Sequence, residues 1–134
     1  MKFVDTSFWI ALRFRRDGRH TDARALWEAG TGALLTSNLV LGETWTFLRR
    51  KAGHRPALEF YEAARRLPSL TVRHVDPDLD ADAWRWLARR DERSYSYVDA
   101  TSFAIMRRLR LREALAFDGD FAAAGFVEAR PAPG

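Results

Sequence analysis

Four acidic residues occupy positions from which their carboxylates could act together. Asp5 ends a short strand-like run, Lys2–Asp5, and Asp118 follows the apolar run ALAF at residues 114–117. The carboxyl ends of parallel strands meet at one edge of a sheet, where open α/β folds place their ligand chemistry. Each acid also has a simpler explanation, because Asp5 could cap the next helix and Asp118 could be a turn residue before Gly119.

The two other acids, Glu43 and Asp99, lie inside predicted helices on faces that we expect to be buried. Each shares its helical face with apolar or small side chains, which are Leu39, Val40 and Phe47 for Glu43, and Ser102, Phe103 and Met106 for Asp99. A carboxylate on such a face is unfavourable unless it is paired, protonated or bound to a cation. Glu43 could pair with an arginine, and Asp99 could complete a serine-x-x-acid capping box with Ser96.

These separate explanations do not account for all four acids together, and a bound divalent cation does. Four carboxylates at one sheet edge repel one another and raise their own pKa values. With oxygen ligands and no cysteine in the chain, a hard cation such as Mg²⁺ or Mn²⁺ is expected. Such an ion can activate a bound water and stabilise a phosphate during displacement. Asp120 could supply a further, weaker ligand, or cap the turn at residues 121–124.

Apolar runs alternate with helical periodicity along the chain, which predicts an α/β fold. Strands are expected at residues 2–5, 33–36, 70–75 and 114–117, with a short fifth run at 126–129. Helices are expected at residues 8–12, 20–29, 38–51, 54–67, 77–90 and 97–110. The alternation favours right-handed crossovers and a mainly parallel sheet of four to five strands, with helices on both faces. We expect one domain over residues 1–134, with residues 129–134 as a flexible tail.

Basic residues outnumber acidic ones by 22 to 18, giving a net charge of +4 and a pI near 10.1. All but Lys2 and Lys51 are arginines, whose planar fork suits phosphate and carboxylate, although codon bias also explains a preference for arginine. The surplus favours an anionic partner such as nucleic acid or an acidic protein segment. Candidate phosphate contacts, unless they are simply solvated charges, are Arg13, Arg15, Arg16, Arg49 and Arg50.

The compartment and the partners are only weakly constrained by composition. The absence of cysteine excludes disulfides and thiolate catalysis and is compatible with a reducing cytoplasm. No apolar run is long enough to span a membrane, and the first residues lack the pattern of a signal peptide. We therefore expect a cytoplasmic protein with no membrane partner.

With the acids placed, the chain resembles the PIN-domain family, and within it the VapC-type toxin ribonucleases. The matching segments are FVDTSFWIAL around Asp5, NLVLGETWTFL around Glu43, SYSYVDATSFAIMRRL around Asp99 and ALAFDGDFAAAGF around Asp118. The resemblance implies a three-layer α/β/α sandwich. It also implies a Mg²⁺- or Mn²⁺-dependent site built by these acids, which cleaves RNA endonucleolytically with a metal-activated water.

The same resemblance implies partners and supporting residues. It implies a homodimer that is neutralised by a small VapB-like antitoxin, in a heterotetramer or larger assembly. A hydroxyl beside the first acid is matched by Thr6 or Ser7, and the helix cap would pass to one of these two. The fourth acid is Asp118 or Asp120, and we favour Asp118 because it directly follows the predicted strand.

Three other functions compete with a ribonuclease toxin. A receiver domain of a response regulator also clusters acids at a sheet edge, but it needs a lysine at a late strand end, and neither Lys2 nor Lys51 lies there. A non-catalytic PIN-like RNA- or protein-binding module would be favoured if the acidic positions carried other residues, and all four carry an acid. DNA nucleases of related fold usually have a longer chain and further acids.

Overall fold

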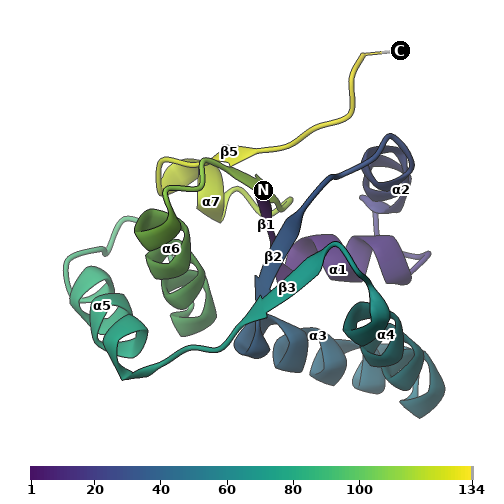
Figure 1. Ribbon diagram of the computed structural model, residues 1–134, viewed down its shortest axis with the longest axis horizontal. Coiled ribbons are helices and arrows are strands. Elements are labelled where there is room, and N and C mark those ends of the chain that lie inside the picture. Colours follow the sequence, from purple (N-terminus) through teal and green to yellow (C-terminus); the bar gives the residue numbers. More distant parts are fainter. Residues whose placement is uncertain (134) are drawn as a thin grey trace.

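Short apolar runs form the strands of a five-stranded parallel sheet in the computed structural model, which describes residues 1–133 (Figure 1). The strands are β1 Lys2–Val4, β2 Leu34–Ser37, β3 Leu70–Arg73, β4 Glu113–Leu115 and β5 Val127–Glu128. Their order across the sheet is β3-β2-β1-β4-β5, and each neighbouring pair is parallel. The first strand is therefore central, with Phe3 paired to Leu35 on one side and Ala114 on the other.

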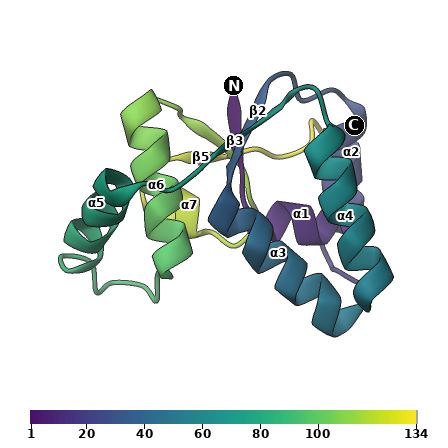
Figure 2. The same cartoon turned by 60° about the horizontal axis from the view of Figure 1, so that its bottom comes forward.

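Helices cover both faces of this sheet, as Figures 1 and 2 show from two directions. They are α1 Thr6–Arg13, α2 His20–Glu28, α3 Asn38–Lys51, α4 His54–Arg66, α5 Pro77–Leu87, α6 Tyr97–Leu109 and α7 Asp120–Ala123. Helices α1 to α4 lie on one side of the strands, and α5, α6 and the short α7 lie on the other. The predicted three-layer α/β/α arrangement is confirmed. Among the described residues, no helix is long and apolar enough to cross a membrane.

Local sequence determines where several helices begin. Asp5, Ser37, Asp76 and Ser96 each accept a hydrogen bond from a backbone N–H of the first helical turn, at the start of α1, α3, α5 and α6 respectively. Such caps satisfy donors that the helix itself leaves free. Because α1 and α3 begin directly after β1 and β2, their caps lie at the carboxyl edge of the sheet.

Two predicted strands end two residues early in the structure, for the same reason. Val4 pairs with Leu115, and β1 then turns into α1, so Ala116 and Phe117 have no strand beside them. In the same way β2 ends at Ser37, opposite Arg73, and the predicted continuation of β3 to residue 75 is unpaired. A strand needs a neighbour for its backbone hydrogen bonds, and periodicity in one segment does not show where that neighbour stops.

The chain that we expected to be a free tail from residue 129 is anchored at its start. Ala129 is buried. The Arg130 guanidinium donates to the Ala116 carbonyl oxygen at 2.7 Å, pairs with Glu128 at 2.9 Å, and lies 5.0 Å from the centre of the Phe117 ring. Residues 129 and 130 are therefore packed onto the domain, which corrects the tail boundary.

An aromatic cluster holds α6 against α5 and α7. Phe103 is fully buried, and its ring centre lies 5.1 Å from that of Trp86 in α5 and 4.9 Å from that of Phe121 in α7. Edge-to-face contacts of this kind add to the free energy gained from burial alone. Since Asp99 lies one turn earlier on α6, this packing also sets the position of that carboxylate.

Phe103→Ala is therefore expected to lower the free energy of unfolding by about 3–5 kcal/mol, because it removes a buried ring and leaves a cavity. Urea denaturation followed by circular dichroism measures this change. Leu58→Ala, at a side chain that is 42% exposed, is the control and should cost less than about 1 kcal/mol. Equal decreases in the free energy of unfolding for the two variants would show that Phe103 has no special role in the core.

Candidate metal centre

Asp5 lies at the end of the central strand and is only 2% exposed. Its Oδ2 accepts hydrogen bonds from the Ser7 backbone N–H at 3.1 Å and from the Ser7 hydroxyl at 2.7 Å. Asp5 is thus the N-cap of α1 itself, so our expectation that the cap would pass to Thr6 or Ser7 was wrong. The cap occupies one carboxylate oxygen, and no hydrogen bond within the described residues occupies Oδ1.

Of the two hydroxyls expected beside Asp5, Ser7 makes the structural contacts. While its Oγ donates to Asp5, it also accepts a hydrogen bond from the Phe117 backbone N–H at 3.0 Å. Ser7 therefore ties the end of β1 to the segment that leaves β4. The Thr6 hydroxyl is buried and has no hydrogen-bond partner among the described residues.

Three further acids converge from α6, from the loop after β4 and from the start of α7. One carboxylate oxygen from each of Asp99, Asp118 and Asp120 lies within 4.8 Å of the others. Asp99 also completes the capping box with Ser96, with Oδ2 accepting from the Ser96 backbone N–H at 3.0 Å. The capping role and the cluster role are compatible, because a carboxylate has two oxygens. The sequence left open whether Asp118 or Asp120 is the fourth acid. In the structure both belong to this acidic cluster.

The electrostatics of the site favour a positive ligand. Burial raises the pKa of Asp5 to about 8, and the charges of Asp118 and Asp99 add to this effect. Burial likewise raises the pKa of Asp99 to about 6, with Asp118 and Asp120 contributing. The pKa of Asp118, the most exposed of the three clustered acids, is raised by partial burial and by the charge of Asp120. An oxygen-only donor set under mutual repulsion fits a hard divalent cation such as Mg²⁺ or Mn²⁺.

Arg93, in the loop between α5 and α6, is a site residue that the sequence reasoning missed. Its Nε donates to Asp120 Oδ1 at 2.9 Å, and its Nη2 donates to the Asp118 carbonyl oxygen at 3.3 Å. This guanidinium neutralises part of the acidic cluster. Nothing in the local sequence distinguishes Arg93 from the chain's other arginines; only its closeness to Ser96 and Asp99 along the chain was a signal.

Glu43 does not join the acidic cluster, and its expected burial was wrong. The buried face of α3 is formed by Val40, Thr44 and Leu48, and Glu43 lies beside that face and is exposed. One residue corresponds to about 100° of rotation on a helix, so a side chain next to the buried stripe can face solvent. Glu43 lines an open cleft of about 710 Å³ that is shared with Tyr97, at the start of α6.

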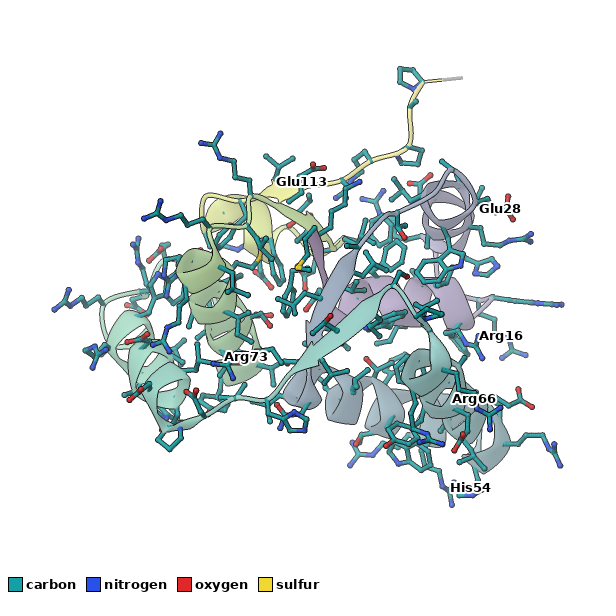
Figure 3. All side chains as sticks on the ribbon, in the orientation of Figure 1. Arg16, Glu28, His54, Arg66, Arg73 and Glu113 are labelled. Carbon is teal, nitrogen blue, oxygen red and sulfur yellow. The ribbon has the colours of Figure 1, made fainter. Side chains whose placement is uncertain are left out.

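The arginines proposed to contact phosphate lie away from the acids. Arg13 ends α1, and Arg15 and Arg16 follow it, whereas Arg49 and Arg50 lie in the last turn of α3. Both helices begin at the carboxyl edge of the sheet, so at 1.5 Å per residue these arginines are about 12 and 18 Å along them. Figure 3 shows Arg16 at the outer edge of the molecule, on the α1 side of the sheet.

The raised pKa values predict that the metal-free protein loses stability as the pH rises. The unfolded chain releases these protons near the ordinary aspartate pKa of 3.8, whereas the folded protein retains them up to a pKa of about 8 at Asp5 and about 6 at Asp99. Folding therefore becomes less favourable between about pH 4 and pH 8, by up to about 1.4 kcal/mol per pH unit for each group. Melting in EDTA should give a higher Tm at pH 5 than at pH 8.

Asp5→Asn is the matched test of this pH dependence, because asparagine can still cap α1 but carries no charge. We expect this variant to have a flatter dependence of Tm on pH than the wild type and a higher Tm at pH 8. A wild-type Tm that rises between pH 5 and pH 8 in EDTA would contradict the assignment of buried, protonated carboxyls.

A divalent cation is expected to stabilise the folded chain by mass action. At a free ion concentration of a hundred times Kd, the free energy of unfolding increases by about 2.7 kcal/mol. Titration with Mn²⁺ at pH 7.5 should therefore raise the Tm of the wild type and of Asp78→Asn, a control at an exposed acid outside the cluster. Asp118→Asn should lose most of the shift. Equal shifts in the two variants would place the ion elsewhere.

Comparison with known proteins agrees with this architecture. The PIN domain family model matches residues 2–127. The chain is 57% identical over 132 residues to the 23S rRNA-specific endonuclease VapC20 of Mycobacterium tuberculosis, covering 98% of this chain and 99% of that protein. It is 28% identical over 123 residues to a VapC ribonuclease of Archaeoglobus fulgidus, covering 88% and 77% of the two chains.

Solved structures show the same relationship. The crystal structure of M. tuberculosis VapC20, described as a sarcin–ricin loop cleaving toxin, aligns with a TM-score of 0.93 at 54% identity, covering 98% of this chain and all of that one. A chain of a toxin–antitoxin complex from Klebsiella pneumoniae shares the fold, with a TM-score of 0.65 at 18% identity and coverage of 95% and 96%. From the family model, the whole-length relatives and the shared architecture, this chain belongs to the PIN domain family.

Proposed function

We propose that this chain is the toxin of a type II toxin–antitoxin pair and acts as a metal-dependent endoribonuclease. The observation that carries the proposal is the convergence of Asp99, Asp118 and Asp120 within 4.8 Å of one another, near the buried Asp5. These carboxylates at the carboxyl edge of the sheet repel one another and destabilise the metal-free protein, and a bound cation would remove this repulsion. A pure binding module has no need of such an arrangement.

In this proposal the four aspartates hold one or more Mg²⁺ or Mn²⁺ ions. When bound, such an ion would lower the pKa of a water and stabilise the charge of a phosphate under attack. Asp5 would hold the ion through the oxygen that Ser7 leaves free, since Ser7 holds Oδ2 in place. Arg93 keeps Asp120 oriented through its hydrogen bond and supplies a positive charge beside the reacting phosphate.

Glu43 has a different part in the proposal. It lines the cleft that adjoins the start of α6, and from there it would act on the site through water. Substitution of a residue that supports a metal site without binding the ion itself typically lowers activity by about 10–100-fold. Arg13, Arg15, Arg16, Arg49 and Arg50, at or beyond the last turns of α1 and α3, would contact phosphates a few nucleotides away from the cut, and Arg50 also lines the cleft that holds Glu43.

The substrate we propose is 23S ribosomal RNA, cut within the sarcin–ricin loop. The support is the 57% identity to VapC20, which extends over nearly the whole length of both chains. A positively charged chain also suits a polyanionic substrate. The enzyme would then work in the cytoplasm, where ribosomes are found.

The proposed protein partner is a small VapB-like antitoxin that blocks the acidic site. The support comes from two structural neighbours, one described as a toxin and the other as part of a toxin–antitoxin complex. A homodimer that binds antitoxin as a heterotetramer or larger assembly remains our expectation.

Asp99→Asn and Asp118→Asn are each expected to lower the rate of 23S rRNA cleavage by at least about 100-fold, since each removes a charged metal ligand. Glu43→Gln should lower it by about tenfold, and Asp78→Asn should leave it unchanged. Primer extension on rRNA from purified ribosomes incubated with enzyme and Mg²⁺ measures both the rate and the site of the cut.

RNA that the wild type binds but never cuts, with either metal ion, would sink the enzymatic proposal and leave a non-catalytic RNA-binding module. Cleavage of other RNAs with 23S rRNA intact would keep the enzyme and overturn the substrate. A loss for Glu43→Gln as large as that for Asp99→Asn would make Glu43 a direct ligand.

A further inference from the structure

Five arginines surround one groove on the α5–α6 face, outside the acidic cluster. Arg85, Arg89 and Arg90 come from α5 and the residues just after it, and Arg107 and Arg108 come from the end of α6. With Trp86, Asp82 and Ala104 they line an open volume of about 610 Å³. We call this feature the arginine groove. Figures 1 and 2 show α5 and α6 side by side at one end of the molecule.

The groove has far more positive than negative charge. Its single lining acid, Asp82, is shared by Arg85 and by Arg108, whose Nη2 lies 2.7 Å from Asp82 Oδ2. Arg90 has a weak contact with Glu92 at 3.6 Å. Arg89 and Arg107 have no carboxylate partner among the described residues.

Trp86 holds two of these guanidinium groups in place. The Arg90 guanidinium carbon lies 5.2 Å from the Trp86 ring centre, and that of Arg107 lies 5.7 Å from it. The indole itself is packed against Tyr95 and Phe103. Stacking on an aromatic face leaves the N–H edges of a guanidinium free for a phosphate. Partial burial lowers the pKa of Arg107, the charge of Asp82 offsets part of this effect, and the charge of Arg90 adds to it.

The groove is within reach of a strand bound at the acids. Asp99 and Arg107 are eight residues apart on one continuous helix, which is about 12 Å along its axis. At about 3.4 Å per phosphate along one strand of a nucleic acid helix, this distance corresponds to about four nucleotides. Arg93, which contacts Asp120, lies in the same α5–α6 connection as Arg89 and Arg90.

We propose that the arginine groove binds the sugar–phosphate backbone of an RNA whose cut strand lies at the acidic cluster. The groove holds several guanidinium groups in fixed positions. A chain of regularly spaced phosphates fits such a row of groups better than an acidic protein segment does, because the carboxylates of a protein segment are isolated from one another. Since the contacts go to phosphates, the groove orients a folded RNA and adds affinity without reading its sequence. This inference rests on the proposed ribonuclease function for its substrate, and its test is separate.

The test measures binding of a synthetic sarcin–ricin stem-loop RNA in EDTA, so that no cleavage occurs, by fluorescence anisotropy over a range of salt concentrations. Arg89→Gln/Arg107→Gln removes two exposed charges of the groove. Arg65→Gln/Arg66→Gln removes two exposed charges from α4 and is the matched control. The groove variant should bind at least about tenfold more weakly than the wild type. The slope of log K against log [salt] should fall in magnitude by about 1 to 2. The control variant should stay within about twofold of the wild type.

Circular dichroism melting of both variants verifies that they are folded. Equal affinities and equal salt slopes for the groove and control variants would overturn the proposal, even if the groove variant loses binding to an acidic protein partner. Failure of the nuclease proposal would be visible separately, as intact 23S rRNA after incubation of the wild type with Mg²⁺. A groove-specific loss of RNA affinity would then still support an RNA-binding surface.

Discussion

Repulsion among carboxylates at a desolvated sheet edge is the constraint on which this structure depends. Asp5 is buried at the end of the central strand, and its Oδ2 is held by Ser7, which also holds the Phe117 backbone N–H. This small network ties the start of α1 to the loop that carries Asp118. The hydrogen bonds that start the helices therefore also bring the acids together. Each cap uses one oxygen and leaves the other for a ligand, so helix capping and cation binding are compatible.

The positive charges are arranged around this negative centre in three ways. Arg93 contacts the acidic cluster directly, through Asp120. Other arginines pair with acids on their own helix, as Arg24 does with Glu28, and such exposed pairs contribute little to stability. In the arginine groove, Arg85 and Arg108 share Asp82, Arg89 and Arg107 have no carboxylate partner among the described residues, and the guanidinium groups of Arg90 and Arg107 lie beside Trp86. Composition alone assigns the net charge of +4 to no surface.

Much of the architecture could be predicted from local patterns. Apolar runs and helical periodicity located every strand and the six longer helices, because each segment carries its own period. Errors appeared where a neighbour decides the outcome. The fourth strand ends early because β1 turns away after Val4, and residue 130 is fixed by Ala116 and Glu128. Glu43 was misplaced because the buried stripe of α3 passes through Thr44, one position further along the helix.

Local sequence is enough to establish the order of strands and helices along the chain, the capping box between Ser96 and Asp99, and the acids that follow β1 and begin α6. These features depend on residues close together in the chain. Three features could be known only from the folded chain: Asp118 and Asp120 both join Asp99, Arg93 contacts Asp120 and the Asp118 carbonyl, and five arginines share one groove. The physical reason is that such contacts depend on how each helix is rotated over the sheet. That rotation is set by packing of side chains distant in sequence, such as Phe103 against Phe121.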